Sequence, residues 1–223
     1  MESFTSESLN QDLSNQPFFI ELRQFLVKEF SAETIFLYGS YARGDFTEQS
    51  DIDLAVITSD CQLKNYSNTF KGKKLDVWFY QWSQLDPQDP QFLRLANSQL
   101  LLDSKGQGQI FKNSIKKTLT EGPTPLEANH RQHTLDWIEQ MIRRAQEGDI
   151  EGNFRRTWLP VALLGIYFQL RNEWYLGSKQ SFNWLQENDT EGFSLFNAVF
   201  LTPNDLDAIK RLAHHVVNMD LVD

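Results

Sequence analysis

The chain has 223 residues, a formal net charge of −9 at pH 7 and a hydrophobic content of 40%, enough for one large or two modest folded domains. No apolar run approaches the length that crosses a membrane, and a single cysteine, Cys61, excludes an internal disulfide and a cysteine-rich zinc site. The acidic charge without an obvious basic patch argues against a nucleic-acid partner. The polar start Met1–Glu7 is unlike a signal peptide and, with the lone thiol, favours a cytoplasmic protein.

Residues 1–120 have the pattern of an α/β domain with a small mixed sheet flanked by helices. Residues 1–14 are polar, and apolar positions then recur at helical spacing from Pro17 to Phe30. The other expected elements are four strands, a loop and a short helical segment: Thr34–Tyr38, Asp51–Ile57, Leu75–Tyr80 and Gln99–Leu102, the loop Thr58–Thr69, and Gln91–Ala96.

The most informative segment joins the first two strands. Gly39-Ser40 follows an apolar strand, with a helix expected to start at Ser40, and the next strand opens with Asp51 and Asp53. Side chains alternate along a strand, so both carboxylates point to the same face. Two adjacent like charges indicate a bound cation, and Mg²⁺ is the hard ion that oxygen ligands suit. The Gly-Ser turn offers backbone N–H groups and a hydroxyl that suit phosphate oxygens.

A third carboxylate, Asp76, lies in the β-branched and aromatic strand that follows. If this strand pairs beside the one that carries Asp53, Asp76 reaches the same face and completes a site for two Mg²⁺ ions about 4 Å apart. Asp76 could also be the general base that takes the proton of an attacking hydroxyl. Arg43, with a guanidinium suited to phosphate oxygens, is a further candidate for the nucleotide site beside Gly39 and Ser40.

The Gly39-Ser40 pair, a spacer of ten residues, Asp51-Ile52-Asp53-Leu54 and the later Asp76 resemble the motif of the nucleotidyltransferase superfamily that includes DNA polymerase beta. The resemblance implies transfer of a nucleoside monophosphate, with ATP as the first candidate donor, and metal binding by the three aspartates.

Residues 121–223 form the second expected domain, an all-α bundle that follows the linker Glu121–Pro125. The expected helices are Leu126–Gln146, Gly152–Trp174, Ser181–Gln186 and Pro203–Met219. Leu170–Tyr175 with Lys179 resembles a helix-then-lysine segment of the aminoglycoside nucleotidyltransferases. This resemblance implies that Arg171 and Lys179 reach the nucleotide phosphates, and that a glutamate of the first helix, for which we choose Glu139, takes the acceptor's proton.

The leading interpretation is a Mg²⁺-dependent nucleotidyltransferase that modifies a hydroxyl of a small molecule. An aminoglycoside-like acceptor is suggested by analogy and by the acidic charge, which would attract a polycation. Two alternatives stay open: a minimal-nucleotidyltransferase-like enzyme of the toxin–antitoxin kind that adenylylates a protein, and a catalytically silent nucleotide-binding module. A homodimer is possible.

Overall fold

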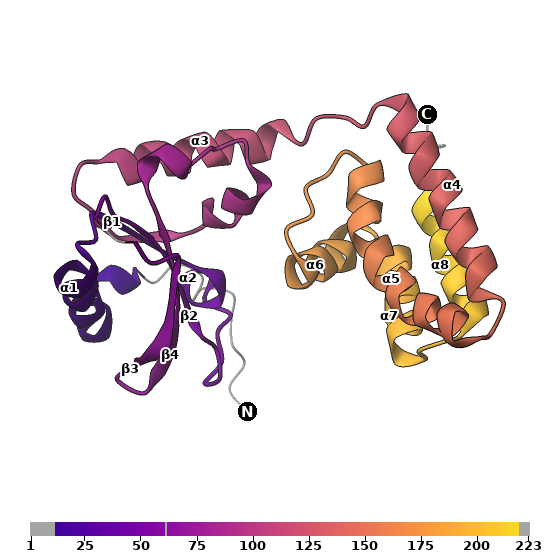
Figure 1. Cartoon of the computed structure of the whole chain (residues 1–223), viewed down its shortest axis with the longest axis horizontal. Coiled ribbons are helices and arrows are strands. Elements are labelled where there is room, and N and C mark those ends of the chain that lie inside the picture. Colours follow the sequence, from indigo (N-terminus) through magenta and orange to yellow (C-terminus); the bar gives the residue numbers. More distant parts are fainter. Residues whose placement is uncertain (1–11, 61, 219–223) are drawn as a thin grey trace. The chain divides into compact units, whose positions relative to one another are not determined.

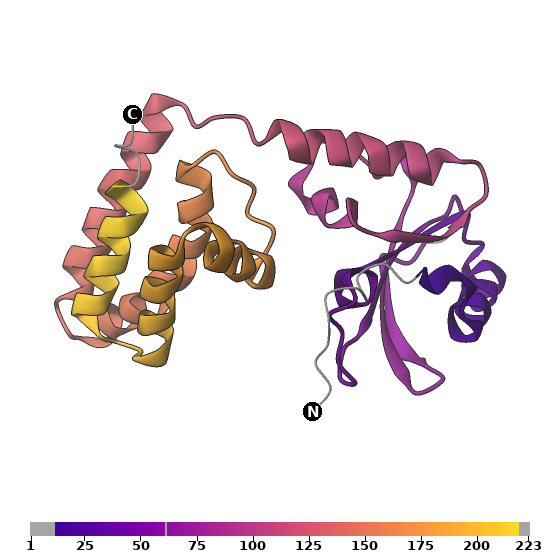
Figure 2. The ribbon, with the colours of Figure 1, turned by 180° about the vertical axis from the view of Figure 1, so that it is seen from behind.

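The computed structural model describes residues 12–60 and 62–218, with the side chain of residue 218 left out; Cys61 and the expected polar stretch before residue 12 lie outside the described residues. The chain divides into two compact units, Met1–Glu121 and Gly122–Asp223. The first unit combines a sheet with helices, and the second is helical, so the expected α/β plus all-α fold is confirmed (Figures 1 and 2).

The N-terminal unit is built on a five-stranded mixed sheet with the order β3-β4-β2-β1-β5. The strands are β1 (Thr34–Tyr38), β2 (Ile52–Ile57), β3 (Asn65–Phe70), β4 (Lys73–Tyr80) and β5 (Gln99–Asp103). The central pair β2 and β4 is parallel, whereas β1–β2, β1–β5 and β3–β4 are antiparallel. This arrangement places the start of β2 directly beside the start of β4.

The two faces of the sheet have different covers. One face packs on α1 (Pro17–Phe30), whose Leu22 and Leu26 are fully buried against the inward residues of β1, β2 and β4. On the other face, Phe111 of α3 (Gln107–Glu121) packs against Phe36 and against Phe92 of η3 (Pro90–Leu95), with ring centroids 6.3 and 5.9 Å apart. The first half of β2 and β4 on that second face carries polar side chains instead.

The expected loop Thr58–Thr69 is wrong in its second half, because Asn65–Phe70 is strand β3. Its inward side chains are Tyr66 and Phe70, which pack on the α1 side of the sheet, while its other residues are exposed. Lys71 and Gly72 both have positive φ and close the hairpin to β4. Polar residues in β3 obscure the apolar–polar alternation that marks a strand. The Lys-Gly pair is the turn signal from which the hairpin could have been predicted.

The helical unit contains α4 (Ala128–Ala145), α5 (Ile150–Leu170), α6 (Ser178–Asn188), α7 (Thr190–Leu201) and α8 (Leu206–Asn218). Its core is lined by Leu159, Leu163, Phe196 and Ile209, all fully buried. Helix α7 was not expected from the sequence. Within the described part of the chain, no helix is both long and apolar enough to span a bilayer.

Candidate active site

Four residues on neighbouring strands form a row across the sheet: Tyr38 on β1, Asp53 on β2, Asp76 on β4 and Ser67 on β3. Tyr38 pairs with Asp53, Asp53 with Asp76, and Asp76 with Ser67. Neighbouring strands lie about 4.8 Å apart, and paired residues direct their side chains to the same face. Asp53 and Asp76 are therefore immediate neighbours, as the sequence predicted if the two strands paired.

Gly39 lies directly against Asp53. It has φ of +69°, and a Cβ atom built there would lie 1.9 Å from Asp53 Oδ2. Both the backbone conformation and the space exclude any other residue without rearrangement. The turn is continued by α2 (Gly39–Arg43), so Ser40 and Arg43 lie near Asp53 and Asp76, which we call the carboxylate row.

The negative charges of Asp51, Asp53 and Asp76 repel one another. Burial, followed by the charges of Asp76 and Asp51, raises the pKa of Asp53 to about 6, against the opposing effect of Arg43 and Arg94. Burial also raises the pKa of the Tyr38 phenol, which makes its ionisation still less favourable. A carboxylate held in such surroundings favours a bound cation or a proton.

Asp51 and Asp76 each have a partner within the unit. Lys74 Nζ lies 2.8 Å from Asp51 Oδ2, and Trp78 Nε1 donates to Asp76 Oδ2 at 3.3 Å. Among the described residues no group of three or more His, Cys, Asp or Glu side chains stands ready to hold a metal ion. Asp53 and Asp76 have the oxygen donors that Mg²⁺ prefers, and Asp51 would first have to release Lys74.

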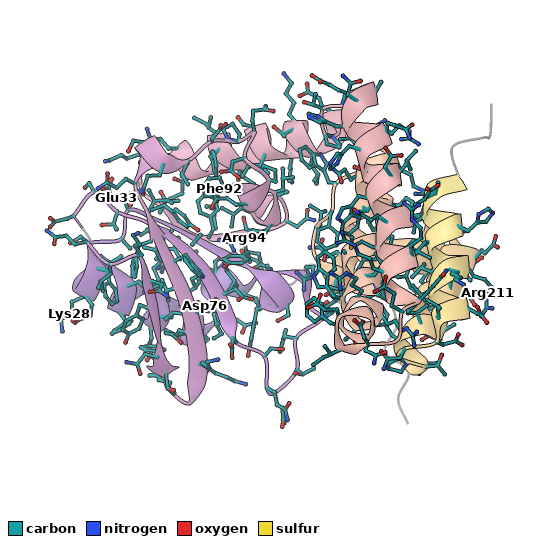
Figure 3. All side chains as sticks on the ribbon, turned by 45° about the vertical axis from the view of Figure 1, so that its right-hand side comes forward. Lys28, Glu33, Asp76, Phe92, Arg94 and Arg211 are labelled. Atoms are coloured by element: carbon teal, nitrogen blue, oxygen red, sulfur yellow. The ribbon has the colours of Figure 1, made fainter. Side chains whose placement is uncertain are left out.

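Arg94 is a component of the site that sequence reasoning missed. It projects from η3, and its guanidinium lies 4.8 Å from the ring centroid of Tyr38 and donates to the Tyr80 hydroxyl at 2.9 Å. Figure 3 shows Arg94 and Phe92 on the same side of the sheet as Asp76. An arginine in a short helical segment carries no sequence signal that separates it from an ordinary surface arginine.

Arg171, the expected phosphate ligand of the helical unit, is held within that unit. It follows α5, lies 3.7 Å from the ring centroid of Tyr167, and donates to the carbonyl oxygens of Tyr167, His215 and Val216 at 3.0–3.3 Å. Burial lowers its pKa. These bonds tie the end of α5 to α8, and the side chain would have to leave them to reach a phosphate.

Glu139 and Lys179 also belong to the helical unit. Glu139 is an exposed residue in the second half of α4, and Lys179 is an exposed residue in the first turn of α6. The structure brings Gly39, Ser40, Arg43, Asp51, Asp53 and Asp76 together in the N-terminal unit and leaves Glu139, Arg171 and Lys179 in the other. Their roles toward a nucleotide stay predictions.

One known family matches the part of the chain that carries this geometry. The family described as polymerase beta, nucleotidyltransferase, matches residues 21–99. No curated protein matches the sequence. Among solved structures, a nucleotidyltransferase-like protein from Exiguobacterium sibiricum 255-15 is similar, with 13% identity and a TM-score of 0.43 over 90% of this chain and 72% of the other.

The matched segment contains the glycine turn, the three aspartates and Arg94. Residues 21–99 thus match a nucleotidyltransferase domain of the polymerase beta family.

Proposed function

We propose that the protein transfers a nucleoside monophosphate, in the first instance AMP from ATP, to a hydroxyl group of a small molecule and depends on Mg²⁺. The observation that carries the proposal is the pairing of Asp53 with Asp76 on adjacent parallel strands, next to the Gly39 turn. Two carboxylates in this position, with the pKa of one raised by burial and by the other, form a site for divalent cations.

Asp53 and Asp76 would hold the metal, joined by Asp51 after its separation from Lys74. When bound, Mg²⁺ would neutralise charge on the phosphates during displacement at the α-phosphorus. Ser40, the backbone N–H groups of the turn and Arg43 would bind the terminal phosphates. Arg171 and Lys179 of the helical unit would add phosphate contacts only if their side chains reached the nucleotide.

In the reaction, the acceptor oxygen forms a bond to the α-phosphorus, the bond from that phosphorus to the bridging oxygen breaks, and pyrophosphate leaves. The acceptor's proton goes to a carboxylate, either Asp76 or Glu139. For Asp76 this requires that the carboxylate oxygen not bonded to Trp78 face the acceptor.

An aminoglycoside-like polycation is the acceptor class that we propose to test first. The chain carries a net charge of −9, and residues 121–223 contain nine Lys or Arg against fifteen Asp or Glu, a difference of 9 − 15 = −6. A cationic acceptor would be attracted to such a surface. The same charge makes a polyanionic acceptor such as RNA unfavourable.

The test is pyrophosphate release by the purified chain with Mg²⁺, each nucleoside triphosphate in turn and an aminoglycoside and lincosamide panel. We expect acceptor-dependent release that falls at least about a thousandfold in Asp53→Asn and in Asp76→Asn. Asp60→Asn, an exposed carboxylate beyond the other end of β2, is the matched control and should keep full activity.

Two outcomes would overturn parts of the proposal. Release that persists in both site variants would remove the carboxylate row from the mechanism. Nucleotide binding that requires Mg²⁺, without release on any small acceptor, would redirect the search to protein acceptors or to a regulatory role.

A further inference from the structure

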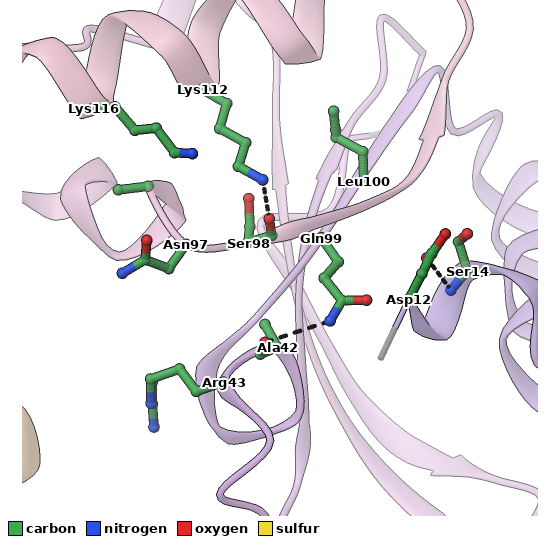
Figure 4. Close-up of a pocket in the computed structure, with 11 residues that line it drawn as sticks. Asp12, Ser14, Ala42, Arg43, Asn97, Ser98, Gln99, Leu100, Lys112 and Lys116 are labelled. Carbon is green, nitrogen blue, oxygen red and sulfur yellow. Dashed lines mark hydrogen bonds between the residues drawn. The ribbon is translucent and has the colours of Figure 1, made fainter. Parts of the chain in front are cut away.

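A pocket of about 640 Å³ opens at the sheet edge formed by β5, and Asp53 and Asp76 are not among its lining residues. Its walls come from four elements: Asp12 precedes η1 (Leu13–Asn15), Arg43 ends α2, Asn97 and Gln99 lead into β5, and Lys112 and Lys116 project from α3 (Figure 4). The pocket therefore lies next to the proposed active site and shares Arg43 with it.

The lining is cationic in an acidic protein. Arg43, Lys112 and Lys116 contribute three positive charges, and Asp12 contributes one negative charge. Figure 4 shows Asp12 on the opposite side of the pocket from Lys116, Asn97 and Arg43. Arg43 is paired with Asp45 at 3.3 Å between Nη2 and Oδ1, so Lys112 and Lys116 of α3 make the larger contribution to the positive charge of this part of the pocket.

The two lysines of α3 are four residues apart, so they project from the same side of the helix. Lys112 is partly buried and donates to the carbonyl oxygen of Ser98, and burial together with the charge of Lys116 lowers its pKa. Among the described residues neither side chain forms an ion pair with a carboxylate, whereas their neighbour Lys117 lies 3.6 Å from Glu121. Two neighbouring positive charges that lack a carboxylate partner favour the binding of an anion.

Hydrogen bonds between neighbouring elements hold the pocket wall in place. Gln99 accepts from the backbone N–H of Leu13 at 2.9 Å and donates to the carbonyl oxygen of Ala42 at 3.4 Å. Ser98 donates to the carbonyl oxygen of Leu95 at 2.7 Å. These bonds join η1, α2, η3 and β5, so the cations are presented on a frame that needs little ordering when a ligand binds.

We propose that this pocket is a binding site for a phosphate-bearing group, held by Lys112 and Lys116 of α3 on one side and by Arg43 on the other. Lysine and arginine are the side chains that bind phosphate oxygens, the first as a point charge and the second as a planar fork. The inference does not rest on the proposed nucleotidyl transfer, because it involves neither the carboxylate row nor a metal.

The proposal is tested by calorimetric titration of the full chain with sodium pyrophosphate at low ionic strength in the presence of EDTA. We expect saturable binding that is at least tenfold weaker in the double variant Lys112→Gln/Lys116→Gln. Lys117→Gln, on the same helix but paired with Glu121, is the matched control and should bind like the unaltered protein.

Because Lys112 also holds the Ser98 carbonyl, its loss could disturb the fold, so Lys116→Gln alone is the second variant. Lys116 is exposed, and its substitution should weaken binding several-fold while the unfolding transition stays in place. Absence of saturable pyrophosphate binding, or equal binding by all these variants, would overturn the proposal.

Two further arms identify where the phosphate comes from and separate this site from the proposed reaction. Displacement of pyrophosphate by ATP would assign the pocket to the terminal phosphates of the nucleotide. Binding of inorganic phosphate or glucose 6-phosphate alongside saturating ATP would assign it to a phosphorylated acceptor or effector. Pyrophosphate binding that persists in Asp53→Asn/Asp76→Asn would uphold the pocket even if those residues prove to have no role in transfer.

Discussion

Two aspartates, one in each unit, show how differently a fold can surround a carboxylate. Asp53 lies beside Asp76 and near Asp51, and its pKa is raised by burial and by those like charges. Asp189, which is buried in the helical unit, accepts from Tyr167 Oη at 2.7 Å and from the Gly192 N–H at 2.9 Å, and lies 2.7 Å from His215 Nε2. Burial works against the charge of Asp189, but these partners outweigh it and its pKa is lowered.

The difference is the one that we expect between a structural site and a ligand-binding site. Asp189 caps the start of α7 and ties α5, α7 and α8 together through charged hydrogen bonds. Every partner there is supplied by the chain. At the carboxylate row, burial and the neighbouring carboxylates disfavour the ionised form of Asp53, and we expect a bound cation to relieve this.

The largest effect that we expect from this comparison is on Asp189. Replacement by Ala removes the acceptor of three donors in a buried position, and we expect the free energy of unfolding to fall by about 3–5 kcal/mol. Urea denaturation followed by tryptophan fluorescence measures it. Asp136→Ala, an exposed carboxylate of α4, should change stability by less than about 0.5 kcal/mol. A loss below about 1 kcal/mol for Asp189→Ala would contradict the structural role.

Gly39→Ala tests the contact between the turn and Asp53. The added methyl group would overlap Asp53 Oδ2 and place a non-glycine residue at φ of +69°, so we expect a loss of about 2–4 kcal/mol. Gly106 has φ of +71° but nothing within 4 Å of the built Cβ, and Gly106→Ala should lose only about 1 kcal/mol. Equal losses in the two variants would show that the close approach to Asp53 has no energetic effect.

Asp53→Asn should have the opposite effect on stability. Because the folded pKa, about 6, exceeds the unfolded value, the ionised carboxylate destabilises the metal-free protein increasingly as pH rises from about 4 to 7. After allowance for partial exposure, we expect the variant to be more stable by about 1–2 kcal/mol at pH 7.5 and equal to the unaltered protein near pH 4.

The measurement is urea denaturation in EDTA at several pH values between 4 and 8. Asp60→Asn carries the same charge change at the far end of β2 and should show no such pH-dependent gap. A gap that is constant with pH, or a less stable Asp53→Asn protein, would refute the repulsion at the carboxylate row.

The sequence predicted the arrangement of the carboxylate row in more detail than the packing of the helical unit, and the reason is physical. Alternation along a strand is local, so Asp51 and Asp53 could be assigned to the same face from spacing alone. The register of Asp53 with Asp76 depends on a parallel pairing across the β3–β4 hairpin, which could only be stated as a condition.

Arg94 and Arg171 show the limit of such reasoning. Whether an arginine faces a carboxylate row, as Arg94 does, or is held among helix carbonyls, as Arg171 is, depends on tertiary packing. Nothing within a few residues of either one encodes that packing. The local pattern of glycine, Arg43 and aspartates could therefore be recognised in the sequence, whereas Arg94 could not.

The smallest effect that we expect is the stabilisation of the nucleotide-free protein by Mg²⁺ itself. An ion that binds only the folded state at a concentration of a few times its Kd adds about 1 kcal/mol to the free energy of unfolding. At the carboxylate row it must compete with protons for Asp53, so the stabilisation should be present at pH 8 and lost as pH falls through about 6. Thermal unfolding with MgCl₂ against NaCl of equal ionic strength measures it. Asp53→Asn should abolish the effect, whereas Asp189, whose partners are all within the chain, should contribute no Mg²⁺ dependence. Equal Mg²⁺ stabilisation at pH 5 and pH 8 would place the ion away from Asp53.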